Sequence, residues 1–192
     1  NEHGKYHPME YVYWDHNYIT KTRVEEKQDL ERAMEQSIDF RLRADVPVAA
    51  YLSGGLDSSI IASLAADRTN KLNTFSIQFD DGQYDESGYQ KLMADAIGVN
   101  HTAFTCTAAD IGDVLPEVVF HAEKPMFRTA PAPMFLLSQK VRDAGFKVVL
   151  TGEGADEVFA GYDIFRENMV RRHMLTCSNP TYINDLMAQL YP

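Results

Sequence analysis

The stretch from Val46 to Ser59, Val-Pro-Val-Ala-Ala-Tyr-Leu-Ser-Gly-Gly-Leu-Asp-Ser-Ser, decides the fold class. Its apolar first half, residues 46–52, is too short for a buried helix and is followed at once by Ser-Gly-Gly, so we interpret it as a buried strand. A helix is predicted from about residue 57 to residue 66. A buried strand that passes through a glycine turn into a helix begins a βαβ unit.

The rest of the chain continues this alternation. An amphipathic helix is predicted over 24–43, where apolar residues recur every four positions, and we expect it to cover one face of a sheet. Further strands are expected at 72–79, 101–105 and 147–150, and further helices at 86–97, 109–121 and 134–144. Strands that alternate with helices of this length imply a parallel sheet with helices on both faces, which is a doubly wound α/β fold.

The composition limits the classes of partner. A formal net charge of −10 over 192 residues disfavours a nucleic-acid partner, because such partners are bound through clustered Lys and Arg. No apolar run approaches the roughly 20 residues of a membrane span, so no membrane partner is expected. The two cysteines, Cys106 and Cys177, lack CxxC spacing, and the six histidines show no metal-ligand pattern. These features indicate a reducing, cytoplasmic setting without a zinc site.

The ends of the sequence suggest a piece of a longer polypeptide, because the chain opens without Met and stops just after an apparent helix. We expect residues 1–22, rich in Tyr, His and Pro, to form an extended lead-in. Residues 23–192 are expected to form one domain that is truncated at its C-terminus. A monomer and a homodimer both stay open.

Two of the predicted strands end in glycine-rich turns, at Ser53 and at Thr151, and ligands of doubly wound sheets bind beyond the carboxyl ends of the strands. In the first turn, Gly54 and Gly55 let backbone N–H groups face inward, while the hydroxyls of Ser53, Ser58 and Ser59 add further donors. The following helix directs its positive dipole end to the same place, which suits a pyrophosphate.

Asp57 would repel a bare phosphate at this turn, so it fits best as a ligand of Mg²⁺ that also touches a nucleotide. The alternative is that Ser-Gly-Gly is only a tight turn and Asp57 only a helix N-cap. Neither a Walker loop nor GxGxxG is present, which disfavours a P-loop kinase, a GTPase and a dinucleotide dehydrogenase.

The second turn carries an acidic cluster, Glu153, Asp156 and Glu157. Such a cluster is either a solvated loop or a set of carboxylates that share a divalent cation or a cationic substrate group. Its place beside the other turn favours the second interpretation. We expect residues 153–157 to be partly mobile without nucleotide, because their charges lack an evident protein partner.

The motifs resemble a known family. Ser53-Gly-Gly-Leu-Asp-Ser58 is similar to the pyrophosphate loop of the N-type ATP pyrophosphatases, which have an adenine nucleotide alpha hydrolase-like fold. The block from Lys147 to Tyr162, Lys-Val-Val-Leu-Thr-Gly-Glu-Gly-Ala-Asp-Glu-Val-Phe-Ala-Gly-Tyr, resembles the signature of glutamine-dependent asparagine synthetases and their β-lactam synthetase relatives. Tyr84-Asp85-Glu86 and Tyr13-Trp14-Asp15 resemble that family at matching places.

The resemblance implies a role for each residue of the two turns. Leu52 and Ile77 would contact the adenosine, with Thr151 and Gly152 adding backbone contacts to the nucleotide. Pyrophosphate and Mg²⁺ would be held by the residues of the first turn, Ser53, Gly54, Gly55, Asp57 and Ser58. Glu153 matches an acid that is important for forming the acyl-adenylate, and Asp156 would assist with the metal or the pyrophosphate. Catalytic roles are thus implied for Glu153, Asp57 and Asp156, and metal binding for Asp57 and Asp156.

The implied reaction is ATP-dependent amidation of the aspartate side chain through β-aspartyl-AMP, by a ligase that receives ammonia from a glutaminase domain. That domain begins with a catalytic cysteine in the family, and neither cysteine of this chain matches it. Two alternatives stay open: another carboxylate-adenylating enzyme such as a β-lactam synthetase, and a non-catalytic adenine-nucleotide-binding module. Arg128 contacts either a phosphate or carboxylate of a ligand, or a surface acid.

Overall fold

The computed structural model describes residues 23–80, 82, 85–175 and 180–188. The chain divides into two compact units, residues 1–36 and residues 37–192. Of the first unit, the structure describes residues 23–36, which belong to helix α1 (Arg23–Arg41). The predicted lead-in, 1–22, and Tyr84 of the second unit lie outside the described residues.

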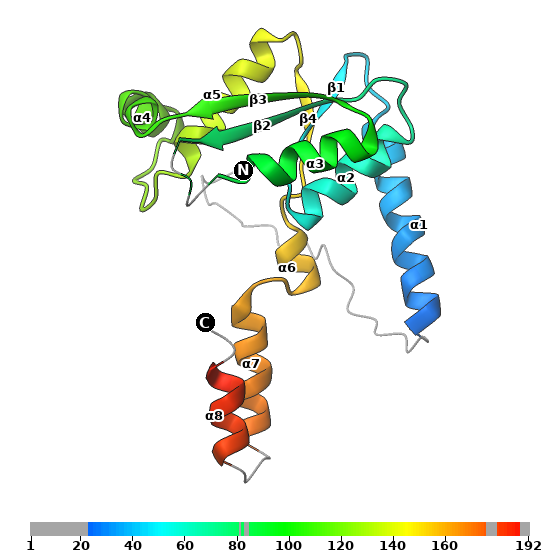
Figure 1. The fold of residues 1–192 in the computed structure, drawn as a ribbon, viewed down its shortest axis with the longest axis vertical. Helices are drawn as coiled ribbons and strands as arrows, with labels where there is room; N and C mark the ends of the chain where they lie inside the picture. Colours follow the sequence, from blue (N-terminus) through cyan, green and yellow to red (C-terminus); the bar gives the residue numbers. More distant parts are fainter. Residues whose placement is uncertain (1–22, 81, 83–84, 176–179, 189–192) are drawn as a thin grey trace, which may run out of the picture. The chain divides into compact units, whose positions relative to one another are not determined.

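The second unit contains a four-stranded parallel sheet with the order β3-β2-β1-β4 (Figure 1). Its strands are β1 (Val48–Tyr51), β2 (Asn73–Phe79), β3 (Asn100–Cys106) and β4 (Val148–Leu150). From β1 the chain adds β2 and then β3 on one side, whereas β4 pairs with β1 on the other side. The strand order therefore reverses between β1 and β4, and such a switch point is where open α/β sheets bind ligands.

Helices connect the strands and continue after the last one. The helices of the connections are α2 (Leu56–Ala66), α3 (Ser87–Ile97), α4 (Ala108–Ala122) and α5 (Pro131–Asp143). Those after β4 are α6 (Ala155–Phe159), α7 (Asp163–Met174) and α8 (Pro180–Ala188). A capping box begins α4: Thr107 Oγ1 accepts from the Asp110 amide at 3.2 Å, and the Asp110 carboxylate accepts from the Thr107 amide at 2.8 Å. No helix in the described part of the chain is long and apolar enough to cross a bilayer.

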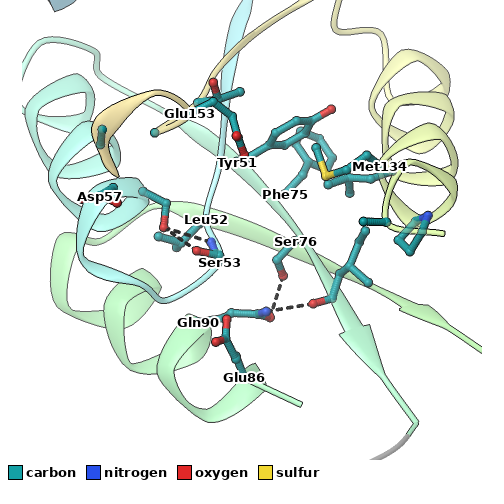
Figure 2. Close-up of a pocket in the computed structure, with 18 of the residues that line it drawn as sticks. Tyr51, Leu52, Ser53, Asp57, Phe75, Ser76, Glu86, Gln90, Met134 and Glu153 are labelled. Carbon is teal, nitrogen blue, oxygen red and sulfur yellow. Dashed lines mark hydrogen bonds between the residues drawn. The ribbon is translucent and has the colours of Figure 1, made fainter. Parts of the chain in front are cut away.

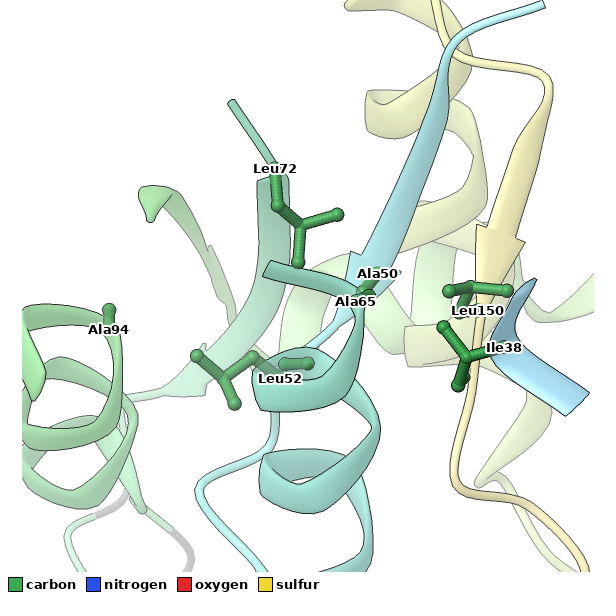
Figure 3. Close-up of a cluster of buried hydrophobic side chains, with 8 residues drawn as sticks. Ile38, Ala50, Leu52, Ala65, Leu72, Ala94 and Leu150 are labelled. Atoms are coloured by element: carbon green, nitrogen blue, oxygen red, sulfur yellow. The ribbon is translucent and has the colours of Figure 1, made fainter. Parts of the chain in front are cut away.

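One face of the sheet packs against α2 and α3 (Figure 3). Five alanines among the described residues have no exposed surface: Ala49 and Ala50 on β1, Ala62 and Ala65 on α2, and Ala132 on α5. Ala50, Ala62 and Ala65 belong to this cluster, where short side chains let the helix backbone approach the central strand closely. The cluster is completed by larger residues from several elements, Ile38, Leu52, Leu72, Ala94 and Leu150.

The other face of the sheet packs against α5. Ala49 and Phe75 on the sheet meet Leu137 and Val141 on the helix, and Phe75 makes an edge-to-face contact with Phe146 at a centroid distance of 5.5 Å. Both faces of the sheet are therefore covered, and the doubly wound α/β prediction is confirmed.

The predicted elements match the observed ones closely. Helix 24–43 was expected to cover one face of a sheet, and its end within the second unit does so, since Ile38 and Leu42 join the core on the α2 side. In the last turn of α7, Arg171 and Arg172 lie where cations are stabilised by the negative end of the helix dipole.

Substitution at the end of α1 tests whether this turn belongs to the core. Ile38→Ala removes a side chain that is 2% exposed and should lower the free energy of unfolding by about 2–5 kcal/mol. Phe40→Ala, two residues further on and 55% exposed, is the matched control and should cost less than about 1 kcal/mol. Urea denaturation measures both, and equal losses would contradict the assignment of Ile38 to the core.

Candidate active site

The two glycine-rich turns meet at the switch point of the sheet. After β1 the chain passes through Ser53 and two glycines into α2, and after β4 it passes through residues 151–154 into α6. A Cβ placed on Gly152 would lie 2.9 Å from Asp57 Cβ and 3.0 Å from the Ser58 nitrogen. Only glycine fits at position 152, because the β4 turn lies directly against the first turn of α2.

Internal hydrogen bonds hold the first turn. Ser53 Oγ accepts from the Gly55 amide at 3.2 Å, and Ser58 Oγ accepts from the Ser53 amide at 3.1 Å. The Ser58 hydroxyl donates to the Gly55 carbonyl at 3.2 Å, so its proton is used and the Ser53 hydroxyl must be the donor in the 2.8 Å contact between the two serine oxygens. The turn is thus ordered by its own side chains before any ligand binds.

Gly54 and Gly55 form the backbone of this turn on the side that faces α2 and α3. Gly54 has a φ of 86°, and a Cβ there would lie 2.8 Å from Tyr89 Cβ and 2.9 Å from the Gln90 nitrogen of α3. Gly55 is the N-cap residue of α2, which places Asp57 inside the first helical turn. The alternative that Asp57 is the N-cap is therefore wrong.

A cavity of about 400 Å³ opens at the carboxyl edge of the sheet between these turns (Figure 2). Nine of the eleven residues to which the family resemblance implies a role line it: Leu52, Ser53, Asp57, Ser58, Ile77, Thr151, Gly152, Glu153 and Asp156. Gly54 and Gly55 do not, since they build the turn rather than the wall. The Ser59 hydroxyl, expected to be a further donor, is buried, has no hydrogen-bond partner among the described residues and lies outside the cavity lining.

One side of the cavity is largely apolar. Phe75 from β2 and Met134 and Leu137 from α5 lie on this side, with Tyr51 beside them (Figure 2). The Tyr51 hydroxyl is 3.1 Å from Ser138 Oγ, which orients its ring. A cavity of this volume with an apolar wall and a few polar groups is typical of a small-molecule site.

The other side of the cavity is acidic. Asp57, Glu153, Asp156 and Glu157 contribute four carboxylates there, and Glu86 lines the cavity beside Gln90 (Figure 2). Glu157 accepts a hydrogen bond from the Tyr162 hydroxyl at 2.8 Å, and this bond raises the pKa of the Tyr162 phenol above its ordinary value. The expectation that these acids lack a protein partner is therefore wrong for Glu157, while the mobility of residues 153–157 stays a prediction.

The donor set suits a magnesium ion that arrives with a nucleotide. Within the described ranges, no three potential ligands from Asp, Glu, His and Cys lie close enough to form a metal cage. Mg²⁺ needs no such cage, because it keeps several waters and binds one or two carboxylates together with phosphate oxygens. Asp57 in the first turn of α2 and Asp156 in the first turn of α6 both line the cavity and supply that number of carboxylates.

A buried series of side-chain hydrogen bonds runs from the cavity wall to β3. Gln90 on α3, 3% exposed, donates from Nε2 to the Ile77 carbonyl at 2.8 Å and accepts at Oε1 from the Ser76 hydroxyl at 2.7 Å. The carbonyl can only accept, so the orientation of the Gln90 amide follows from it. Two dashed lines in Figure 2 mark these bonds.

The same series of hydrogen bonds continues to His101, where the donors and acceptors are also fixed. Because Ser76 has given its proton to Gln90, the contact of 3.1 Å between His101 Nε2 and Ser76 Oγ requires Nε2 to donate. In the neutral ring Nδ1 then accepts from the Thr74 hydroxyl at 2.9 Å, a much shorter contact than the 3.5 Å from the same hydroxyl to the Asn100 carbonyl. His101 is held as the neutral Nε2–H tautomer, and burial lowers its pKa.

Comparison with known proteins gives the family. The asparagine synthase family model matches residues 29–189. The chain belongs to the asparagine synthase family. It is 39% identical over 144 residues to a putative asparagine synthetase [glutamine-hydrolyzing] of Mycobacterium tuberculosis, covering 75% of this chain and 22% of that protein. It is 33% identical over 158 residues to asparagine synthetase [glutamine-hydrolyzing] 1 of Bacillus subtilis, covering 81% and 25%.

Other relatives extend this picture. Amidase chyE of Penicillium rubens is 35% identical over 179 residues, covering 82% of this chain and 27% of that protein. Among solved structures, NMN synthetase from Francisella tularensis matches with a TM-score of 0.43 and 18% identity, covering 65% of this chain and 52% of that one. The chain spans about a quarter of the length of the curated relatives it matches. Membership of the asparagine synthase family rests on the sequence matches.

For this asparagine synthase family chain, sequence reasoning missed the wall of the cavity. Ser76, Gln90, Phe75 and Met134 line it without having been singled out. The sequence did contain a signal for Gln90. In the predicted helix 86–97 this polar residue falls on the same face as Ala94, which is a core-facing position. Arg128 lines a neighbouring cavity that shares Phe79, Ala130 and Pro133 with this one, but does not line this one.

A single methyl group tests the contact between the two turns. Gly152→Ala should lower the free energy of unfolding by about 1–3 kcal/mol, because the added Cβ meets backbone and Cβ atoms at 2.9–3.0 Å. Gly112→Ala, inside α4 with nothing within 4 Å, should be neutral or stabilise by up to about 1 kcal/mol. Chemical denaturation of the two variants compares them, and a neutral Gly152→Ala would show that the turns do not touch.

Burial of neutral His101 predicts a pH dependence of stability. The pKa of His101 in the folded chain lies below its ordinary value, so on acidification the unfolded state takes up the proton first and stability falls below about pH 6.5. Asp95 acts in the opposite direction and less strongly than burial. Urea unfolding at about pH 5.5 and about pH 7.5 should show a smaller difference for His101→Gln than for the parent, and equal differences would contradict the burial of a neutral imidazole.

Proposed function

We propose that this chain binds ATP in the cavity at the switch point and that the full-length protein uses it to adenylate the side-chain carboxylate of aspartate, which ammonia then converts to an amide. The observation that carries this proposal is the contact of Gly152 with Asp57 and Ser58. It brings two motifs about 100 residues apart in the sequence to one cavity, and nine of the residues implied by the family resemblance line that cavity.

The cavity supports a division between base and phosphates. The apolar side, with Phe75, Met134 and Leu137, suits a purine ring, and Leu52 and Ile77 lie next to it. The first amides of α2 have no acceptors within the helix and, with the helix dipole, favour an anion at the first turn. The β- and γ-phosphates therefore belong beside Ser53 and Ser58.

The carboxylates on the acidic side of the cavity repel one another, and a bound cation would balance their charge. Asp57 and Asp156 would hold Mg²⁺, which supplies neutralisation of the charge that develops on the departing pyrophosphate. Glu153 follows Gly152 directly and lines the same cavity, and we propose that its carboxylate receives the ammonium group of an amino-acid substrate. Pairing of the ammonium with Glu153 would orient the other end of the substrate toward the nucleotide.

The reaction follows in two steps. An oxygen of the substrate carboxylate attacks the α-phosphorus of ATP, the bond from that phosphorus to the bridging oxygen breaks, and pyrophosphate leaves with the electron pair. Ammonia then attacks the acyl carbon, AMP leaves as the second leaving group, and ammonia loses a proton to solvent. The chain would contribute binding, orientation and fixed N–H donors rather than a nucleophile.

The supply of ammonia belongs to the parts of the protein beyond this chain. Several relatives are named as glutamine-hydrolysing asparagine synthetases, and this chain spans about a quarter of their length. We propose that a glutaminase domain elsewhere in the full-length protein delivers ammonia to the acyl-adenylate.

A second candidate differs in the acceptor. Amidase chyE of Penicillium rubens is as similar to this chain as the asparagine synthetases are. A related enzyme of the same family that adenylates a carboxylate other than aspartate would keep the cavity and change the groups near Glu153.

Exchange of labelled pyrophosphate into ATP tests the proposal in the full-length protein. Exchange should depend on aspartate, and Asp57→Asn should reduce it by at least about 100-fold, the size typical of losing one group that stabilises transition-state charge. Asp113→Asn, the same change on the exposed surface of α4, is the control and should leave exchange unchanged. Exchange that depends on a different carboxylate would favour the second candidate, and ATP binding without exchange would refute the enzymatic proposal.

A further inference from the structure

The chain folds back on itself directly after α6. Ala160 ends the helix in the left-handed conformation, with a φ of 58°, and the Gly161 amide donates to the Asp156 carbonyl at 2.9 Å. A left-handed residue at the end of a helix reverses the direction of the chain, and the returning amide then binds a carbonyl of the helix. Gly161 and Tyr162 therefore lie against the helix that carries Asp156 and Glu157.

Gly161 leaves room for the carboxylate of Asp156. A Cβ placed on Gly161 would overlap Asp156 Oδ1 and would lie 3.0 Å from Asp156 Cγ and 3.3 Å from its Cα. The carboxylate thus occupies the space that any other residue at position 161 would fill with its side chain. The backbone does not require glycine there, because Gly161 is not among the described glycines with a positive φ. Glycine is needed at this position for space alone.

Packing against Gly161 is part of what sets the place of this carboxylate. Asp156 is half-buried and lines the cavity. Among the described residues no hydrogen bond or ion pair holds its carboxylate, whereas the neighbouring Glu157 accepts from the Tyr162 hydroxyl at 2.8 Å. The position of the Asp156 carboxylate therefore depends on the space that is open to it, and Gly161 provides a part of that space.

We propose that Gly161 is a positioning residue of the magnesium site, because its missing Cβ lets the Asp156 carboxylate stay in the cavity lining. The inference rests on the proposed binding of Mg²⁺ with ATP, in which Asp156 is one of two metal-binding carboxylates. Mg²⁺ demands near-ideal octahedral geometry at about 2.1 Å, so a carboxylate that a methyl group displaces binds it less well. Gly161 touches neither the metal nor the nucleotide and acts only through Asp156.

A methyl group at position 161 should move the carboxylate and leave the fold intact. The closest overlap is with the terminal atoms of a half-buried side chain, which can turn to another rotamer. In Gly152→Ala, by contrast, the added Cβ meets backbone atoms of α2. Substitution at position 152 should therefore lower stability, whereas substitution at position 161 should change the metal dependence of ATP binding at an unchanged urea midpoint.

Calorimetric titration of the full-length protein with ATP, in saturating Mg²⁺ and again in EDTA, measures the factor by which Mg²⁺ strengthens binding. This factor should be about tenfold smaller in Gly161→Ala than in the parent, the size typical of losing a group that orients a metal ligand. Binding in EDTA should stay within about twofold of the parent, because the charge of Asp156 remains. Gly88→Ala, at an exposed glycine of α3 with nothing within 4 Å of an added Cβ, is the control and should keep the factor of the parent.

A double-mutant cycle shows whether Gly161 acts through Asp156. Asp156→Ala should reduce the factor at least as much as Gly161→Ala does. Adding Gly161→Ala to Asp156→Ala should reduce it no further, because the carboxylate that the methyl group displaces is already gone. An equal reduction by Gly161→Ala in both backgrounds would show that the effect does not pass through the carboxylate, and would overturn the inference.

The outcomes separate this inference from the proposed function. ATP binding that Mg²⁺ strengthens equally in the parent and in Gly161→Ala, or equally in the parent and in Asp156→Ala, overturns the role of Gly161 and leaves the nucleotide site intact. Failure of the folded parent to bind ATP, with or without Mg²⁺, overturns the proposed function and this inference with it. If Gly161→Ala does not fold, the variant with both substitutions decides: recovery of folding supports the shared position of the Cβ and the carboxylate, and continued misfolding overturns the inference.

Discussion

The contact between Gly152 and the first turn of α2 is the constraint on which the site depends. Asp57 Cβ and the Ser58 nitrogen would lie within about 3 Å of any side chain at position 152, so the turn after β4 sits directly on the start of the helix. This closeness is possible because β1 and β4 are neighbours in the sheet, paired from Val48 to Val148 onward. Sheet pairing sets the distance between the motifs, and the missing Cβ lets them close.

A second layer of organisation lies behind the turns. The hydroxyls of Ser53 and Ser58 bond to their own loop, and Gln90 bonds both to Ser76 and to the Ile77 main chain. Polar groups at the edge of the cavity are thus satisfied by neighbours before a ligand arrives, which lowers the entropy lost on binding. The acidic wall is different, because it gathers like charges that a cation would relieve.

The alternation of strands and helices was readable from the sequence, because buried strands and amphipathic helices have different periods and glycine marks their ends. The two motifs were readable as well, since Ser53–Ser58 and 151–157 carry their chemistry in consecutive residues. The cavity wall was not, because Gln90 and Met134 reach Phe75 and Ser76 only when α3 and α5 pack on the sheet.

The pairing of β1 with β4 also has a consequence for the order of folding. Residues 48–52 can collapse on α2 and β2 early, because those partners are near in sequence, but β4 must close a loop of about 100 residues before it reaches β1. The cavity exists only after that last strand has docked. Any molecule that binds there distinguishes the finished chain from a partly folded one, and so draws the folding equilibrium toward the native state by mass action.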